Sequence, residues 1–210
     1  QSYVLWGVTQ ECLKRTIFPM GNLHKKDIKQ MAIDRGYKAL AEKSESYEIC
    51  FIPDNDYRGF LKRRVEGLEE KVKGGKFMSL AGEELGEHDG YPFYTIGQRK
   101  LGISLGDEPT YVVSINEVDN IVVVGTKEDL KKQAMYVRNI NYVKFPKLED
   151  GIELKVKVRY KHKGEMATIT NEGDTIKVLF HSKVEGIAPG QSAAFYDGDD
   201  LVAGGFIMKK

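Results

Sequence analysis

The sequence has few of the residues that bind metals or form disulfides, and those it has are scattered. Its 210 residues include two cysteines, Cys12 and Cys50, which lie too far apart for a metal-ligand pair or a disulfide framework. The four histidines are also dispersed, at His24, His88, His162 and His181. We therefore expect no metal site, and the cysteine content is typical of a protein from a reducing cytoplasm.

Long apolar runs, an excess of one charge and a phosphate-binding loop are missing as well. No stretch approaches the roughly 20 apolar residues needed to cross a bilayer, and no signal peptide is recognised. The 32 basic and 31 acidic residues leave a net charge of +1, so any contact with nucleic acid must come from a local cluster of cations. Without a glycine-rich phosphate loop, this chain is not expected to bind ATP by itself. These absences favour a cytoplasmic protein with no membrane partner.

Helical patterns come first in the chain, and β patterns follow. Residues 9–15, 24–35 and 55–64 read as short helices, and Gly36 is placed to end the second one. From Gly67 onward the chain has glycines, charges and short apolar runs, as all-β regions do. Strands are expected at residues 93–96, 111–115, 121–124, 135–140, 153–160, 165–171, 175–181, 192–196 and 201–207.

These patterns predict an α+β chain that is mostly β and has three parts. A short helical part is expected at residues 1–58, a small central β domain at 59–132 and a six-stranded β-barrel at 133–210. The chain starts at Gln1 rather than at a methionine and enters an apolar run almost at once. We interpret it as cut from inside a longer protein.

A basic stripe is predicted in the strand at residues 153–160 and just beyond it. Cations and apolar residues alternate there, and period-two geometry places the cations on one face: Lys155, Lys157, Arg159, Lys161 and Lys163. The alternate positions are expected in the core: Leu154, Val156, Val158 and Tyr160. The stripe is suited to neutralising phosphates. An ordinary solvated face is the alternative.

Cys50 lies within a strand-like segment, residues 48–52, just before a helix start at Pro53 and Asp54. A thiol just before a helix N-terminus is close to the positive end of the peptide dipoles, which favours the thiolate or a persulfide over the neutral form. A small apolar residue in a core strand is the alternative interpretation. The residues alone leave both open.

Four stretches go beyond these general patterns. They are Gln1-Ser2-Tyr3 with Phe18-Pro19-Met20-Gly21, Ile49-Cys50-Phe51-Ile52, Tyr94-Thr95-Ile96-Gly97-Gln98-Arg99-Lys100, and Pro189-Gly190-Gln191-Ser192-Ala193 with Phe195-Tyr196. In this order they resemble the tRNA-specific 2-thiouridylases (MnmA/TrmU). The likeness covers the C-terminal part of such an enzyme. The family's N-terminal ATP-binding domain has no counterpart in this sequence.

The resemblance implies an activity and a set of site residues. The full enzyme uses ATP to adenylate the C2 oxygen of the wobble uridine of tRNA and then replaces that oxygen with persulfide sulfur. Cys50 matches the persulfide-bearing cysteine, and the family's other catalytic cysteine, which forms a disulfide with it, belongs to the absent domain. Gln1, Arg159, Tyr160 and Gln191 match tRNA contacts.

The same resemblance implies partners and relates the barrel to a known domain. The implied partners are tRNA and a sulfur-donor protein, either a cysteine desulfurase or a sulfur-relay protein. The barrel is expected to resemble domain 2 of translation elongation factors. Two other functions stay open: a stand-alone RNA-binding module with a structural Cys50, and tRNA methyl transfer, a label that this family has also carried.

Overall fold

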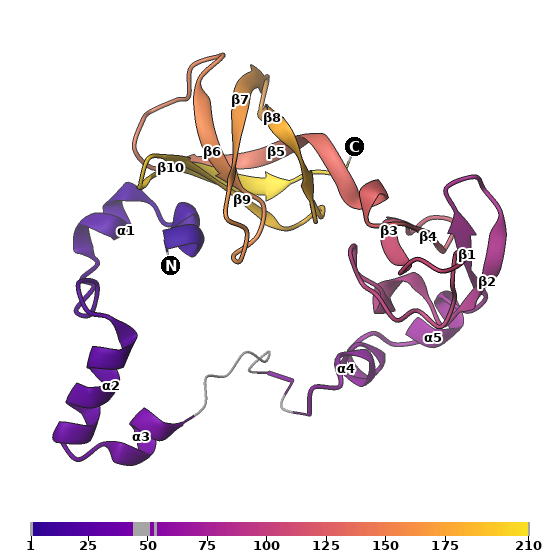
Figure 1. Ribbon diagram of the computed structural model, residues 1–210, viewed down its shortest axis with the longest axis horizontal. Helices are drawn as coiled ribbons and strands as arrows, with labels where there is room; N and C mark the ends of the chain where they lie inside the picture. The colour runs from indigo at the N-terminus through magenta and orange to yellow at the C-terminus, as the bar shows by residue number, and fades with distance from the viewer. Residues whose placement is uncertain (1, 44–50, 53, 210) are drawn as a thin grey trace. The chain divides into compact units, whose positions relative to one another are not determined.

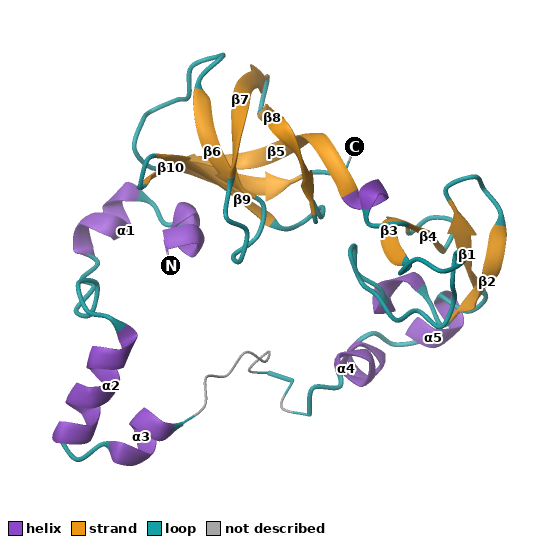
Figure 2. Cartoon of the chain, in the orientation of Figure 1, coloured by secondary structure: helices purple, strands orange, loops and turns teal. Residues whose placement is uncertain are grey.

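The computed structural model describes residues 2–43, 51–52 and 54–209, which form two compact units. One unit is Glu11–Leu68, and the other combines Gln1–Gln10 with Glu69–Lys210. Figure 1 labels the elements in chain order, and Figure 2 shows that helices predominate before β1 and strands after it. The expectation of a mostly β chain with a closed six-stranded barrel is confirmed. Across the described ranges, no helix is both long and apolar enough to cross a membrane.

The smaller unit is built from short helices. Their bounds are α2 at Lys25–Asp34, α3 at Lys38–Glu42 and α4 at Tyr57–Arg64, while α1 at Gln10–Arg15 begins in the other unit. Gly36 ends α2 with φ +86°, and Tyr37 N–H donates to the Ala32 carbonyl across it at 2.8 Å, as expected for a glycine cap. The Asp56 carboxylate caps α4 by accepting from Gly59 N–H at 2.8 Å.

The central β domain is a four-stranded sheet in the order β2-β1-β4-β3. Its bounds are β1 at Gly75–Ser79, β2 at Glu84–His88, β3 at Tyr111–Asn116 and β4 at Ile121–Gly125, with α5 at Leu68–Lys71 before β1. The strands expected at residues 111–115 and 121–124 are confirmed, and they pair antiparallel as a hairpin. The strand expected at residues 93–96 is wrong: Pro92 belongs to the 3₁₀ helix η2, Tyr91–Phe93, and the Phe93 side chain is buried from that turn.

The barrel closes in the order β10-β5-β8-β7-β6-β9. Its strands are β5 at Lys131–Tyr142, β6 at Glu153–Lys157, β7 at Glu165–Glu172, β8 at Thr175–Glu185, β9 at Ser192–Asp197 and β10 at Asp200–Ile207, and the short 3₁₀ helix η3 at Glu128–Leu130 precedes them. Alternate inward residues such as Val156, Val178 and Phe195 are fully buried. All six expected barrel strands are present.

The first residues of the chain pack on the outside of the barrel as a 3₁₀ helix, η1, at Ser2–Gly7. Tyr3 and Trp6 are each only 8% exposed and share a cluster with Ala194 of β9. Gly204 makes this close approach possible, because a Cβ there would lie 2.5 Å from both Trp6 Cβ and Cγ. The segment that contains Tyr3 is therefore held next to the barrel's β9 and β10 strands.

Candidate nucleic-acid interface

The basic stripe of β6 is present, but it ends earlier than expected. Leu154, Val156 and Val158 are fully buried, as predicted for the apolar side of the strand. Tyr160, in contrast, is 57% exposed, so its expected core position is wrong. The physical reason is that β6 ends at Lys157, and period-two geometry no longer applies after it.

A turn follows β6 and places Arg159 and Tyr160 together at the surface. His162 N–H donates to the Arg159 carbonyl at 3.0 Å, and His162 Nδ1 accepts from Val158 N–H at 3.4 Å. Burial lowers the pKa of His162, and the nearby Arg159 cation lowers it further, so the ring stays neutral and can accept. In an ideal strand, neighbours point to opposite faces, whereas this turn lets both side chains be exposed.

The Arg159 side chain lies over the end of β8. Its Nη2 is 3.7 Å from Glu185 Oε1, and the side chain remains 46% exposed. A Cβ on Gly186 would come within 3.0 Å of Arg159 Nη1, so the missing side chain at Gly186 makes room for the guanidinium. An exposed pair of this kind contributes about 0–1 kcal/mol, so the cation can exchange its carboxylate partner for a phosphate.

Tyr160 is connected to the N-terminal segment and to the start of β9 through Tyr3. The Tyr3 and Tyr160 rings meet edge to face with centroids 6.3 Å apart. The Tyr3 hydroxyl donates to the Ser192 carbonyl at 2.7 Å, and burial raises the pKa of Tyr3, which keeps this donor protonated. Tyr3 thus supports the exposed ring of Tyr160 through this edge-to-face contact.

Gln191 lies beside Ser192 in the turn before β9. The Gly190 N–H donates to the Ile207 carbonyl at 2.8 Å, and Ile207 N–H returns a bond to the Gln191 carbonyl at 2.8 Å. Gly190 has φ +85°, which a side chain would disfavour. These bonds fix the Gln191 backbone while its side chain stays exposed.

The arrangement offers three kinds of contact with RNA on neighbouring elements. Arg159 supplies a guanidinium for phosphate, Tyr160 supplies an exposed ring for stacking, and Gln191 supplies an amide for hydrogen bonds. Lys157 extends the positive charge along β6, with its Nζ 5.5 Å from the Tyr196 ring centroid. Within the ranges the structure describes, no group of three metal-ligating side chains converges.

Two predicted site residues, Gln1 and Cys50, lie outside the described residues. Of the strand expected at residues 48–52, only Phe51 and Ile52 are described, and neither is in a strand. Phe51 is 64% exposed, with its ring centroid 5.6 Å from that of Phe60, whereas Ile52 is 3% exposed. The predicted site residues that the structure does describe are Arg159, Tyr160 and Gln191.

Two residues that shape this interface, Tyr3 and Glu185, have no role that the sequence predicts. Tyr3 belongs to a stretch that carries the family resemblance, but no contact was assigned to it, and its partner Ser192 lies 189 positions away. Glu185 ends β8 and faces Arg159 across the barrel surface, which no local pattern could indicate. Both are long-range contacts that only the closed barrel creates.

Comparison with known families and proteins accounts for nearly all of the chain. A model described as tRNA methyl transferase HUP domain matches residues 1–54, one described as tRNA methyl transferase PRC-barrel domain matches 58–126, and one described as Aminomethyltransferase beta-barrel domain matches 132–207.

Several relatives match over almost the whole chain. The tRNA-specific 2-thiouridylase MnmA of Cytophaga hutchinsonii is 54% identical over 210 residues, covering 99% of this chain and 56% of the relative. The protein of the same name from Amoebophilus asiaticus is 54% identical, covering 99% and 55%, and that from Salinibacter ruber is 48% identical, covering 99% and 54%. The chain thus spans about half the length of the curated relatives it matches. It belongs to the tRNA-specific 2-thiouridylase (MnmA/TrmU) family.

Proposed function

We propose that this chain supplies the tRNA-binding β domains and the sulfur-carrying cysteine of a tRNA 2-thiouridylase. In this proposal residues 1–58 belong to the catalytic part and carry Cys50. Residues 59–132 form the central β domain and 133–210 the barrel that contacts tRNA. The full-length enzyme acts in the cytoplasm as a sulfurtransferase.

The single observation that supports tRNA binding most strongly is the joint exposure of Arg159 and Tyr160 after β6. Their positions were assigned by resemblance to the family, and the turn held by His162 makes both side chains accessible on one surface. Relatives at 54% identity are named tRNA-specific 2-thiouridylases, which favours tRNA over other RNAs as the ligand. The near-zero net charge means that binding depends on this local cluster.

In the proposed binding step the barrel positions the tRNA backbone. Arg159 leaves the Glu185 carboxylate and pairs with a phosphate, which gains a charge-assisted hydrogen bond and releases a counterion. Tyr160 then offers its exposed ring to a base or ribose, while the ring of Tyr3 prevents it from folding onto the barrel. Gln1 and Gln191 add polar contacts beside it.

The proposed sulfur step uses Cys50. The terminal sulfur of a Cys50 persulfide forms a bond to C2 of the wobble uridine, and AMP leaves with the electrons of the C2–O bond. A second cysteine thiolate, in the part of the enzyme that this chain does not span, then attacks the Cys50 sulfur. The persulfide S–S bond breaks, the transferred sulfur stays on C2, and a disulfide forms between the two cysteines.

Activation of the uridine and reloading of Cys50 need groups outside this chain. ATP supplies the adenylate, and the sequence has no glycine-rich loop for its phosphates, so we assign ATP binding to the part of the full-length enzyme not spanned here. After reduction of the disulfide, a cysteine desulfurase or a sulfur-relay protein reloads Cys50. The fragment alone is therefore expected to bind tRNA without thiolating it.

Replacement of Cys50 in the full-length protein tests the sulfur step. Cells that depend on the Cys50→Ser enzyme should lose 2-thiouridine from their tRNA, as measured by mass spectrometry of digested tRNA. Cys12→Ser is the matched control, because Cys12 is exposed in α1 and has no proposed role. Unchanged 2-thiouridine with Cys50→Ser would leave Cys50 structural and the chain an RNA-binding module.

Methyl transfer is the second candidate, because two of the matching family models carry that description. The relatives reported above are named for thiolation instead. The same digested tRNA separates the two activities. If removal of the enzyme abolishes a methylated nucleoside and leaves 2-thiouridine unchanged, methyl transfer is favoured.

A further inference from the structure

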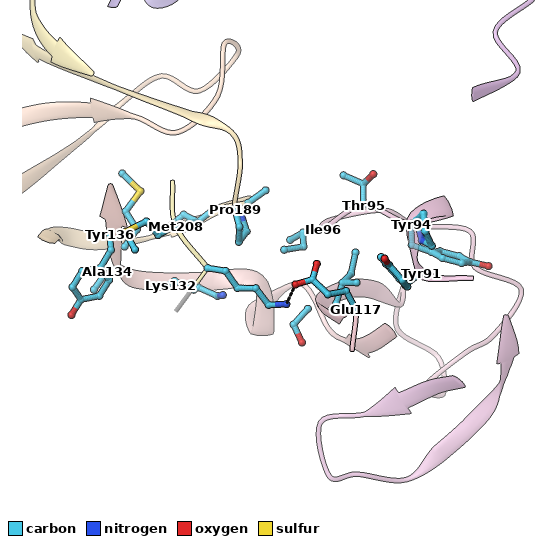
Figure 3. A pocket seen from close by; sticks show the side chains of 17 residues that line it. Tyr91, Tyr94, Thr95, Ile96, Glu117, Lys132, Ala134, Tyr136, Pro189 and Met208 are labelled. Atoms are coloured by element: carbon cyan, nitrogen blue, oxygen red, sulfur yellow. Dashed lines mark hydrogen bonds and ion pairs between the residues drawn. The ribbon is translucent and has the colours of Figure 1, made fainter. Parts of the chain in front are cut away.

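The larger unit contains a pocket of about 500 Å³ that the tRNA surface described above does not use. Residues of the central domain, including Tyr91, Tyr94 and Glu117, line one side, and barrel residues including Met135 and Met208 line the other. Figure 3 shows the two tyrosines at one end, Tyr136 at the other, and Glu117 between them. Its size falls within the range of about 300–1,000 Å³ usual for ligand pockets.

The lining suits a flat, aromatic ligand with polar edges. Tyr91, Tyr94 and Ile96 give an apolar and aromatic wall, and the ring of Tyr94 is held by Phe77, with centroids 5.2 Å apart at 81°. Such walls stack on the faces of unpaired nucleobases. Because Tyr94 is fixed by the sheet core, this wall is formed before any ligand arrives.

An ion pair supplies the polar part of the pocket. Lys209 Nζ lies 3.1 Å from Glu117 Oε1, drawn as a dashed line in Figure 3, and the two side chains are 53% and 59% exposed. A pair this exposed is weak, so a ligand can open it at little cost. Glu117 is the one carboxylate among the described residues that line the pocket.

The carboxylate and the ammonium of this pair together match the Watson–Crick edge of guanine. On its Watson–Crick edge guanine presents two adjacent N–H donors, N1–H and N2–H, with the O6 acceptor beside them, and no other RNA base carries two adjacent donors there. A carboxylate accepts from both donors, and an ammonium donates to O6. We propose that the pocket binds an unpaired guanine of the tRNA, with Glu117 on N1–H and N2–H and Lys209 on O6.

One loop links the pocket to the proposed tRNA surface. Ala188 and Pro189 line it, and Gln191 follows two residues later, with its N–H bonded to the Ala188 carbonyl at 3.2 Å. Lys132, exposed at the pocket, adds a cation for the phosphate of the bound nucleotide. The inference rests on the proposed tRNA binding and adds to it a base-specific contact.

Methionine methyl groups provide a direct readout. With ¹³C-methyl-methionine labelling, two of the six methionines report on the pocket, Met135 and Met208, while four lie elsewhere, Met20, Met31, Met78 and Met166. Titration with GMP should shift the two pocket methyls and leave the other four in place. We expect AMP, CMP and UMP to bind about tenfold more weakly, as a lost bidentate contact implies.

Substitution of Glu117 tests the assigned contact. Glu117→Gln keeps the size of the side chain but replaces one acceptor with a donor, so it should remove the preference for GMP. Glu172→Gln is the matched control, because Glu172 is exposed at the end of β7 and does not line the pocket. Equal affinity for the four nucleotides in the unsubstituted chain, or a GMP preference that survives Glu117→Gln, would overturn the guanine assignment.

A second arm uses tRNA in place of GMP, so that the pocket and the tRNA surface can fail separately. tRNA should shift the Met135 and Met208 methyls, and excess GMP should reverse that shift. If tRNA binds in an Arg159-dependent manner but moves neither methyl, the pocket inference is wrong and the tRNA surface stands. If GMP moves both methyls but tRNA does not bind, the proposed function is wrong and the pocket takes a free nucleotide.

Discussion

Docking of the 3₁₀ helix η1, Ser2–Gly7, on the barrel can be perturbed by one methyl group added at Gly204. A Cβ at Gly204 would lie 2.5 Å from Trp6 Cβ and Cγ and 2.8 Å from the Ala193 carbonyl oxygen, and none of these is the flexible end of a side chain. Gly204→Ala must therefore displace the segment or the strand. Overpacking of this kind costs about 1–3 kcal/mol. Full burial of one large apolar side chain contributes about 1.5–3 kcal/mol, so the clash is comparable with what Trp6 supplies.

Trp6 is also the reporter, because it is the single tryptophan in the chain and is only 8% exposed. In Gly204→Ala we expect a red-shifted tryptophan emission and stronger quenching by acrylamide. We also expect weaker tRNA binding, about tenfold for each 1.4 kcal/mol of undocking. Gly7→Ala is the matched control, since a Cβ there meets nothing within 4 Å.

A Gly204→Ala protein whose tryptophan emission and quenching equal those of the parent chain would show that η1 does not depend on the space at Gly204. An emission that shifts fully to that of exposed tryptophan, with unchanged tRNA affinity, would show that the segment containing Tyr3 does not support the RNA surface.

Two further predictions concern charge. Glu185→Gln removes the carboxylate that competes with phosphate for Arg159, so tRNA affinity should rise about two- to fivefold, in line with the 0–1 kcal/mol of an exposed pair, and a fall in filter-binding affinity would contradict this. His88 Nδ1 accepts from Gly90 N–H at 3.0 Å, and burial lowers the pKa of His88. In the unfolded chain His88 takes up a proton near its ordinary pKa of about 6.5, whereas in the folded chain it takes one up only at lower pH. The contribution of His88 to the free energy of unfolding should therefore be complete above that pH and fall as the pH drops below it. Urea midpoints between pH 8 and pH 5 should show this, with a smaller slope in His88→Gln, and a midpoint independent of pH would refute it.

The strands of the barrel could be predicted from the sequence because alternation of inward and outward residues is a local property. The same alternation failed at Tyr160, since the cation and apolar pattern continues past Lys157 although the strand does not. The turn there depends on the His162 side chain bonding to Val158, which a period-two pattern does not show. At residues 93–96, a buried Phe93 resembled a strand position, but Pro92 placed it in a 3₁₀ turn.

The candidate site was predictable only in part, and for a physical reason. Alternation placed Arg159 in the basic stripe, but Tyr160 and Gln191 were assigned from the family resemblance, and no spacing rule would have joined the three. Their neighbourhood arises because β6 pairs with β9 and because Tyr3 reaches Ser192 from the other end of the chain. Contacts of such long sequence separation depend on barrel closure, which local propensity does not encode.

The central claim is that the turn after β6 binds the phosphate backbone of tRNA. Its most direct test is the salt dependence of tRNA affinity for the parent chain and for Arg159→Ala, with Lys177→Ala on β8 as a control cation outside the stripe. Loss of one phosphate contact should weaken binding and reduce the slope of log affinity against log salt by about 0.7–0.9. Lys177→Ala should leave the slope unchanged. An Arg159→Ala slope equal to that of the parent chain would contradict the account.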